Sequence, residues 1–154
     1  MKRLTYVRAI VLGLALTTAP VGADSDDRSV TAAASGIFAA GAQLGPVALQ
    51  GVQIGTGVFI EADGTASGTF HATLQGSSLF SPQEISVEGN VTGGSVEADG
   101  HATFSGSASV DLGDGAPPLA NVAFTVTVGS DNVVLVVDSI LLTARLTAGA
   151  VTID

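Results

Sequence analysis

The chain has 154 residues, of which 14 are acidic and only five are basic, and it contains neither Cys nor Trp. This length suits one domain with a hydrophobic core of its own. Hydrophobic residues make up 46% of the chain and charged residues 12%, which excludes an acidic disordered segment, because such segments carry few apolar residues.

Residues 1–23 are typical of a secretory signal peptide. Lys2, Arg3 and Arg8 give the segment a positive start, and a short apolar run over 9–16 precedes small residues ending at Ala23. The run is too short for a membrane-spanning helix, which needs about 20 apolar residues. We therefore expect a signal helix that is cleaved, and a secreted or periplasmic chain over residues 24–154.

Removal of this segment makes the chain more acidic. Two basic residues, Arg28 and Arg145, then stand against 14 acidic ones, a formal charge of −12 with no Lys. Nucleic acids and anionic membranes bind clustered Lys and Arg. We therefore expect no nucleic-acid partner and no stable membrane insertion after signal cleavage. The charge favours cations, cationic partners or simply solubility.

Alternation of apolar and polar residues predicts strands through most of the remaining chain, because a period of two is typical of a half-buried strand in an antiparallel sheet. The run over 133–137 lacks this alternation and predicts a strand buried on both faces, or one at the centre of a sandwich. Residues 140–147 fit a short helix or a strand, and 149–154 predict a final strand. The alternating segments are 65–74, 84–91, 101–112 and 121–128.

Turn signals separate these segments. Asp63-Gly64 and Asp99-Gly100 each lie between two predicted strands and are typical of type I′ hairpin turns. The sequence therefore predicts a single all-β domain, an antiparallel β-sandwich or barrel-like fold of about eight to ten strands.

A short sequence recurs within the domain. Glu-Ala-Asp-Gly occurs at 61–64 and again at 97–100, and His-Ala-Thr occurs at 71–73 and at 101–103. The two spacings differ, so this is not a regular repeat. A drifted duplicated hairpin and convergent turn chemistry both fit.

Four segments, 99–108, 124–128, 137–142 and 149–153, resemble a class of bacterial secreted all-β domains. In that class one strand has the form Ala-x-Phe-x-Gly and the domain ends on a strand of the Gly-x-Ile-x-Ile type. The resemblance covers the C-terminal third to half of the chain. It implies a fold and export but carries over no catalytic residue.

The acidic loops are the candidate metal ligands. Asp111 and Asp114 flank a glycine-rich loop of the kind that binds calcium through oxygen ligands, but the loop lacks the further ligands of an EF-hand. A zinc site would need three or four ligands, and His71 and His101 are the only histidines. The sequence thus predicts no cofactor and leaves calcium open.

No catalytic motif is present. There is no Gly-x-Ser-x-Gly elbow, and Glu84 and Glu88 alternate outward on one predicted strand, as solubilising residues do. We expect no enzyme. A catalytic function would instead require a concave pocket that holds His71 or His101 beside a carboxylate.

Trp and Tyr, the usual aromatic anchors, are also lacking after signal cleavage, since the single Tyr lies in the signal segment; Phe70, Phe104 and Phe124 occupy predicted core positions. Thr and Ser on the strands at 65–73 and 103–109 could form a flat hydroxyl face. The sequence thus predicts an exported non-catalytic β-sandwich module with a structural or interaction role. It would bind a protein or surface-polymer partner through sheet edges or its acidic face; the alternative is an extracellular ligand-binding or calcium-stabilised domain.

Overall fold

The computed structural model describes residues 26–79 and 81–154. This part of the chain forms one antiparallel sheet of nine strands without a helix, and so contains none that could cross a membrane. The all-β prediction is confirmed, whereas the predicted signal peptide falls outside the described residues. The strands are β1 (Arg28–Phe38), β2 (Gln43–Leu44), β3 (Val47–Ile60), β4 (Thr65–Ser78), β5 (Ser81–Val96), β6 (Ala102–Asp111), β7 (Leu119–Val128), β8 (Asn132–Val137) and β9 (Ile140–Ile153).

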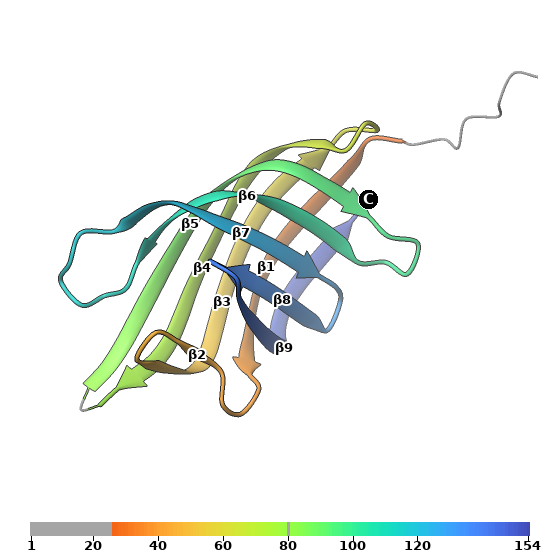
Figure 1. The fold of residues 1–154 in the computed structure, drawn as a ribbon. Coiled ribbons are helices and arrows are strands. Elements are labelled where there is room, and N and C mark those ends of the chain that lie inside the picture. The colour runs from red at the N-terminus through yellow and green to blue at the C-terminus, as the bar shows by residue number, and fades with distance from the viewer. Residues whose placement is uncertain (1–25, 80) are drawn as a thin grey trace, which may run out of the picture.

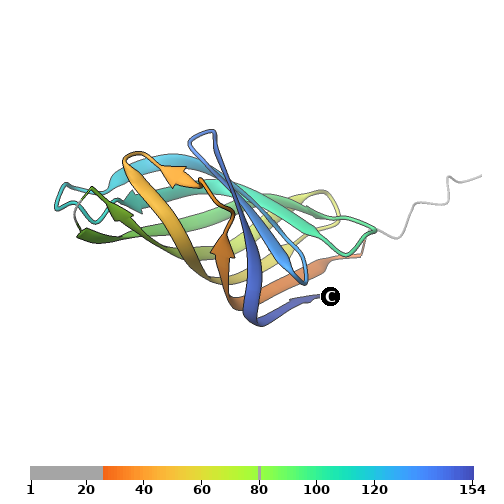
Figure 2. The ribbon, with the colours of Figure 1, turned by 90° about the horizontal axis from the view of Figure 1, so that it is seen from below.

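The sheet closes on itself. Neighbouring strands pair in chain order from β3 to β9, and β1 pairs with both β9 and β3. Val30 of β1 lies opposite Ile153 on one side and Val58 on the other. Figures 1 and 2 show β1, in orange, beside β9, in dark blue. Of the two architectures predicted, the fold is therefore the barrel, and the two-sheet sandwich is not formed.

Apolar side chains fill the inside of the barrel. Among the described residues no polar or charged side chain is buried. Phe70, Phe104 and Phe124 form the aromatic centre, with the Phe70 ring 6.0 Å from that of Phe104 and 5.6 Å from that of Phe124. Full burial of such a side chain stabilises the fold by about 1.5–3 kcal/mol. The predicted core positions of these three residues are confirmed.

The two Glu-Ala-Asp-Gly segments are hairpin turns at the same end of the barrel, between β3 and β4 and between β5 and β6. Gly64 and Gly100 adopt φ of 86° and 85°, a region that favours glycine. Asp63 and Asp99 have no positive φ, so each loop is a type I turn followed by a left-handed glycine. The prediction of type I′ turns is wrong here, and the repeated sequence makes one kind of turn twice.

A type I′ turn does occur, between β8 and β9. Asp138 and Ser139 have φ of 47° and 69°, and Val137 pairs with Ile140 across them. The segment 140–147, for which a helix was an alternative, continues with 149–153 as the single strand β9. The expectation that 133–137 is buried on both faces is wrong, because Val134 and Val136 are partly exposed on its second face.

Candidate functional site

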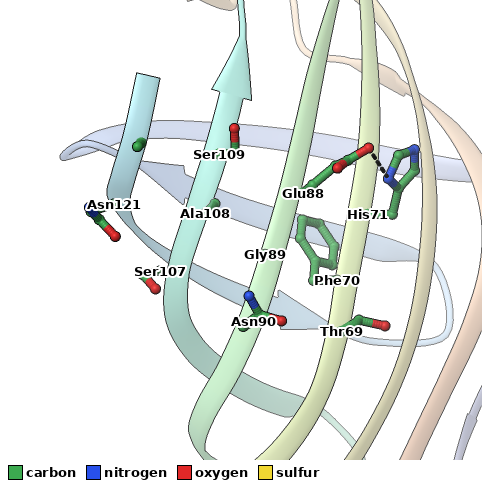
Figure 3. Close-up of a pocket in the computed structure, with 11 residues that line it drawn as sticks. Thr69, Phe70, His71, Glu88, Gly89, Asn90, Ser107, Ala108, Ser109 and Asn121 are labelled. Carbon is green, nitrogen blue, oxygen red and sulfur yellow. Dashed lines mark ion pairs between the residues drawn. The ribbon is translucent and has the colours of Figure 1, made fainter. Parts of the chain in front are cut away.

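A hollow of about 520 Å³ lies on the outer wall of the barrel, across β4, β5, β6 and the start of β7 (Figure 3). It is lined by two rows of outward polar side chains, which cross-strand pairing brings into line. Asn121 of β7 lies at its margin. In order across the sheet the rows are His71–Glu88–Ser109 and Thr69–Asn90–Ser107.

The inward-facing row beneath this hollow includes two small residues, Gly89 and Ala108. Phe70, Gly89 and Ala108 form the row between the two polar rows, with their side-chain positions facing the core. A Cβ at Gly89 would lie only 2.5 Å from Cε1 of Phe124. Strand β5 can therefore lie close to this ring only without a side chain at Gly89. We infer that the inward approach of the wall at this row produces the hollow outside it.

A β-bulge sets one side of the hollow. Ala108 pairs with Val122 and Val110 with Leu119, so Ser109 faces the two residues Ala120 and Asn121. Asn121 has φ of 57°, a conformation that Asn tolerates better than most residues. Bulges of this kind redirect side chains at the rims of barrels. This one brings an amide side chain to the margin of the hollow (Figure 3).

Among the described residues, His71 and Glu88 are the only ionisable ones that line this hollow, with His71 Nδ1 3.7 Å from Glu88 Oε1. The concave pocket with a histidine beside a carboxylate, which a catalytic function would require, is therefore present. However, Glu88 lies between His71 and Ser109, whereas a catalytic triad needs the histidine between acid and nucleophile. Glycoside hydrolysis needs two facing carboxylates, and Glu88 is the single one in the lining.

The second histidine serves a turn rather than the hollow. His101 Nδ1 lies 3.0 Å from Asp99 Oδ1, and the same oxygen accepts a hydrogen bond from the His101 backbone N–H. These hydrogen bonds, the backbone one foremost, lower the pKa of Asp99. His71 lies on β4 and His101 adjoins β6, with β5 between the two strands. The two histidines are therefore not cross-strand neighbours.

The candidate calcium ligands shape their own loop. Asp111 Oδ1 accepts a hydrogen bond of 2.9 Å from Gly113 N, and Asp114 Oδ1 accepts one of 2.9 Å from Ala116 N. Within residues 26–79 and 81–154, no three His, Asp or Glu side chains gather in an arrangement that could hold a metal ion. Asp111 and Asp114 thus act as turn-forming acceptors in this structure, without a third ligand beside them.

A second hollow, of about 800 Å³, lies at the end of the barrel that carries the turns 61–64 and 97–100. Arg28 and Glu97 line it together with Val96, Val151 and Ile153, which pack against the core. The lining of this second hollow therefore combines charged and apolar side chains. The outer-wall hollow, by contrast, brings together hydrogen-bonding side chains from three successive strands.

The outer-wall hollow is only partly foreseen by the sequence. The hydroxyl residues of 65–73 and 103–109 do face outward, but β5 separates the two strands, and the surface is concave where it holds Thr69 and Ser107. The sequence did not single out Asn121, and it marked Asn90 only as the acceptor of a glycosylation motif, Asn90-Val91-Thr92. The outward positions of β5 in its alternation pattern are the signal that could have included Asn90.

The fold and site together define an all-β protein with a closed antiparallel sheet, an apolar interior and a polar hollow on its outer wall. Comparisons with protein-family models, curated proteins and solved structures found no match.

Proposed function

We propose that this chain is an exported, non-catalytic β module with a structural or interaction role at the cell surface or in the extracellular or periplasmic space. Its partner is a protein or a surface polymer. The observation that carries the proposal is the division of the barrel wall: among the described residues every buried side chain is apolar, and the polar side chains face outward.

This division favours binding over chemistry. Catalysis gains most from polar groups held in a site from which water is excluded. The side chains of His71 and Glu88, the histidine–carboxylate pair of the outer-wall hollow, are 54% and 69% exposed and therefore open to solvent. The interior offers no polar group to a substrate within the described residues.

Closure of the sheet also bears on how a partner would bind. A strand edge recruits a partner by leaving backbone groups unpaired. Here β1, which would be an edge in an open sheet, is paired on both sides. The outer walls and the ends of the barrel, rather than a full-length edge, are therefore the surfaces we assign to the partner.

Co-sedimentation tests this proposal. The purified chain is mixed with cell envelopes from the organism that carries the gene, and the fraction that pellets is measured. We expect a fraction of the chain to pellet with the envelopes. A chain that stays in the supernatant contradicts an interaction role at the surface.

Export is tested separately by the mass of the chain recovered outside the cytoplasm. Cleavage after Ala23 predicts loss of residues 1–23, and recovery of the uncleaved chain in the cytoplasm alone contradicts export.

The alternative function, a calcium-stabilised domain, has its own test. If Asp111 and Asp114 take part in calcium binding, millimolar calcium raises the melting temperature, because a ligand that binds only the folded state stabilises it. An unchanged melting temperature removes this alternative and leaves the interaction role standing.

A further inference from the structure

We propose that the outer-wall hollow binds a neutral, polyhydroxylated ligand, a segment of an uncharged glycan, laid across β4, β5 and β6. The inference rests on the proposed interaction role and names the chemical class of its partner. The hydrogen-bonding side chains, charge and shape of the hollow carry it.

The hydrogen-bonding groups in the hollow are open to a ligand. In the part of the chain that the structure describes, none of the side-chain hydrogen bonds uses the side chains of Asn90, Ser107 or Ser109. Farther along β6, by contrast, the hydroxyl of Thr103 pairs with that of Thr127 at 2.9 Å. Amides and hydroxyls both donate and accept, as a sugar hydroxyl does. The hollow therefore offers complementary groups from neighbouring strands.

The shape of the site suits a ligand that crosses the strands. The rows containing Glu88 and Asn90 are two residues apart on β5, which is about 6.8 Å along an extended strand. Neighbouring strands lie about 4.8 Å apart. Gly55 and Gly57 of β3 pair with His71 and Thr69, and a Cβ at either would meet nothing within 4 Å. A chain-like ligand can therefore extend past β4 over an open surface.

The charge of the hollow selects an uncharged ligand. Within the part of the chain that the structure describes, its lining holds one acidic residue, Glu88, and one histidine, His71. An anionic ligand would face Glu88 on an acidic chain, which has 14 acidic residues against five basic ones. A polycation would meet more carboxylates at the hairpin turns 61–64 and 97–100 than here. A neutral polyol is not repelled by Glu88 and is not drawn to the acidic turns. Its hydroxyl groups can donate hydrogen bonds to the Glu88 carboxylate.

The absence of an aromatic platform sets the strength of binding. Phe70 is 1% exposed, and its ring faces the core, so no aromatic face is offered for stacking in the hollow. Binding then depends on hydrogen bonds that replace those to water, and each contributes little net free energy. We expect weak binding by one site, strengthened when a polymer engages several copies of the chain.

The test is an NMR titration of the isotope-labelled chain with millimolar neutral hexasaccharides, namely cello-, malto-, laminari- and mannohexaose. Spermidine serves as the cationic probe and trigalacturonate as the anionic one. We expect at least one neutral sugar to shift the backbone amides at residues 69–71, 88–90 and 107–109. Asn90→Ala is expected to weaken this binding about fivefold, since it removes hydrogen bonds.

Two matched variants separate binding from folding. Ser107→Phe fills the hollow from an exposed position and is expected to abolish the shifts. Thr31→Phe, at an exposed position of β1 outside the lining, is expected to leave them unchanged.

The inference is overturned if no neutral sugar shifts the hollow, if the shifts persist in Ser107→Phe, or if only spermidine or trigalacturonate produces them. If the chain still pellets with envelopes in any of those cases, the interaction role stands and the ligand class alone is wrong.

Discussion

The two faces of the wall formed by β4, β5 and β6 contrast sharply, although they alternate along the same strands. On the inner face Phe70 and Phe104 pack within an apolar centre, and Gly89 has no room for a methyl group. On the outer face Asn90 and Ser107 line an open hollow. We therefore expect the inner face to contribute most of the stability of the fold, and the outer face to tolerate substitution.

Core truncation should give the largest effect. Phe104→Ala is expected to lower the free energy of unfolding by about 3–5 kcal/mol, because it leaves a cavity at a fully buried position. Chemical denaturation measures the loss. Phe59→Ala is the control, since this side chain is 44% exposed, and it should cost distinctly less. Equal losses would mean that the two faces do not differ as described.

A methyl group at the inner face should give the next largest effect. Gly89→Ala is expected to cost about 1–3 kcal/mol, because the new Cβ would press against the Phe124 ring. Gly55→Ala, where a Cβ meets nothing within 4 Å, should be neutral or slightly stabilising. Thermal and chemical denaturation compare the two variants, and a stable Gly89→Ala protein would contradict the close approach of β5 to the core.

Outer-face hydroxyls that are paired should matter more than unpaired ones. Thr103→Val removes the hydrogen bond to Thr127 and is expected to cost about 1 kcal/mol. Ser109→Ala on the same strand lies in the hollow and should stay within about 0.5 kcal/mol of the parent. If Ser109→Ala costs as much as Thr103→Val, the hollow residues are structural and are not free for a ligand.

The smallest expected effect is a pH dependence at the turns. Hydrogen bonds from Thr65 lower the pKa of Asp63, and those from His101 lower the pKa of Asp99. A lowered folded-state pKa stabilises the fold above the unfolded-state pKa of about 3.9, and this stabilisation is lost as the pH falls through the folded-state pKa.

Denaturation of Asp63→Asn with Asp99→Asn at falling pH measures this contribution. The amide oxygen of Asn can still accept a hydrogen bond but does not titrate, so the double variant should lose less stability in acid than the parent. Identical acid dependence of the two proteins would show that these two turn carboxylates do not contribute to stability through their charge.

Much of the fold could be predicted because local patterns suffice for it. Alternation identifies β4 and β6. The glycines at 64 and 100, both with positive φ, complete the hairpin turns that precede these strands. The type I′ turn at Asp138-Ser139 was missed because neither residue is glycine. Residues 140–147 were ambiguous because short apolar segments fit a helix and a strand alike, and only pairing with β8 decides between them.

The hollow was harder to predict because register is not local. Counting back from the pair Val96–Ala102 would put Asn90 opposite Ala108, an outward residue opposite an inward one. A bulge between Val91 and Gly93 shifts the register so that Asn90 faces Ser107. Burial enforces that shift, because a slip of one residue would turn the core side chains toward water.

The sequence by itself determined the all-β class, the aromatic core and the predominance of acidic over basic residues, because each follows from composition or a period of two. Only the tertiary structure decided that the sheet closes and that β5 lies close to the ring of Phe124 beneath the hollow. Both depend on residues far apart in the chain: closure joins Val30 to Ile153, and the close approach joins Gly89 to Phe124. Such contacts carry no local signal, since they arise only when the strands have packed around one core.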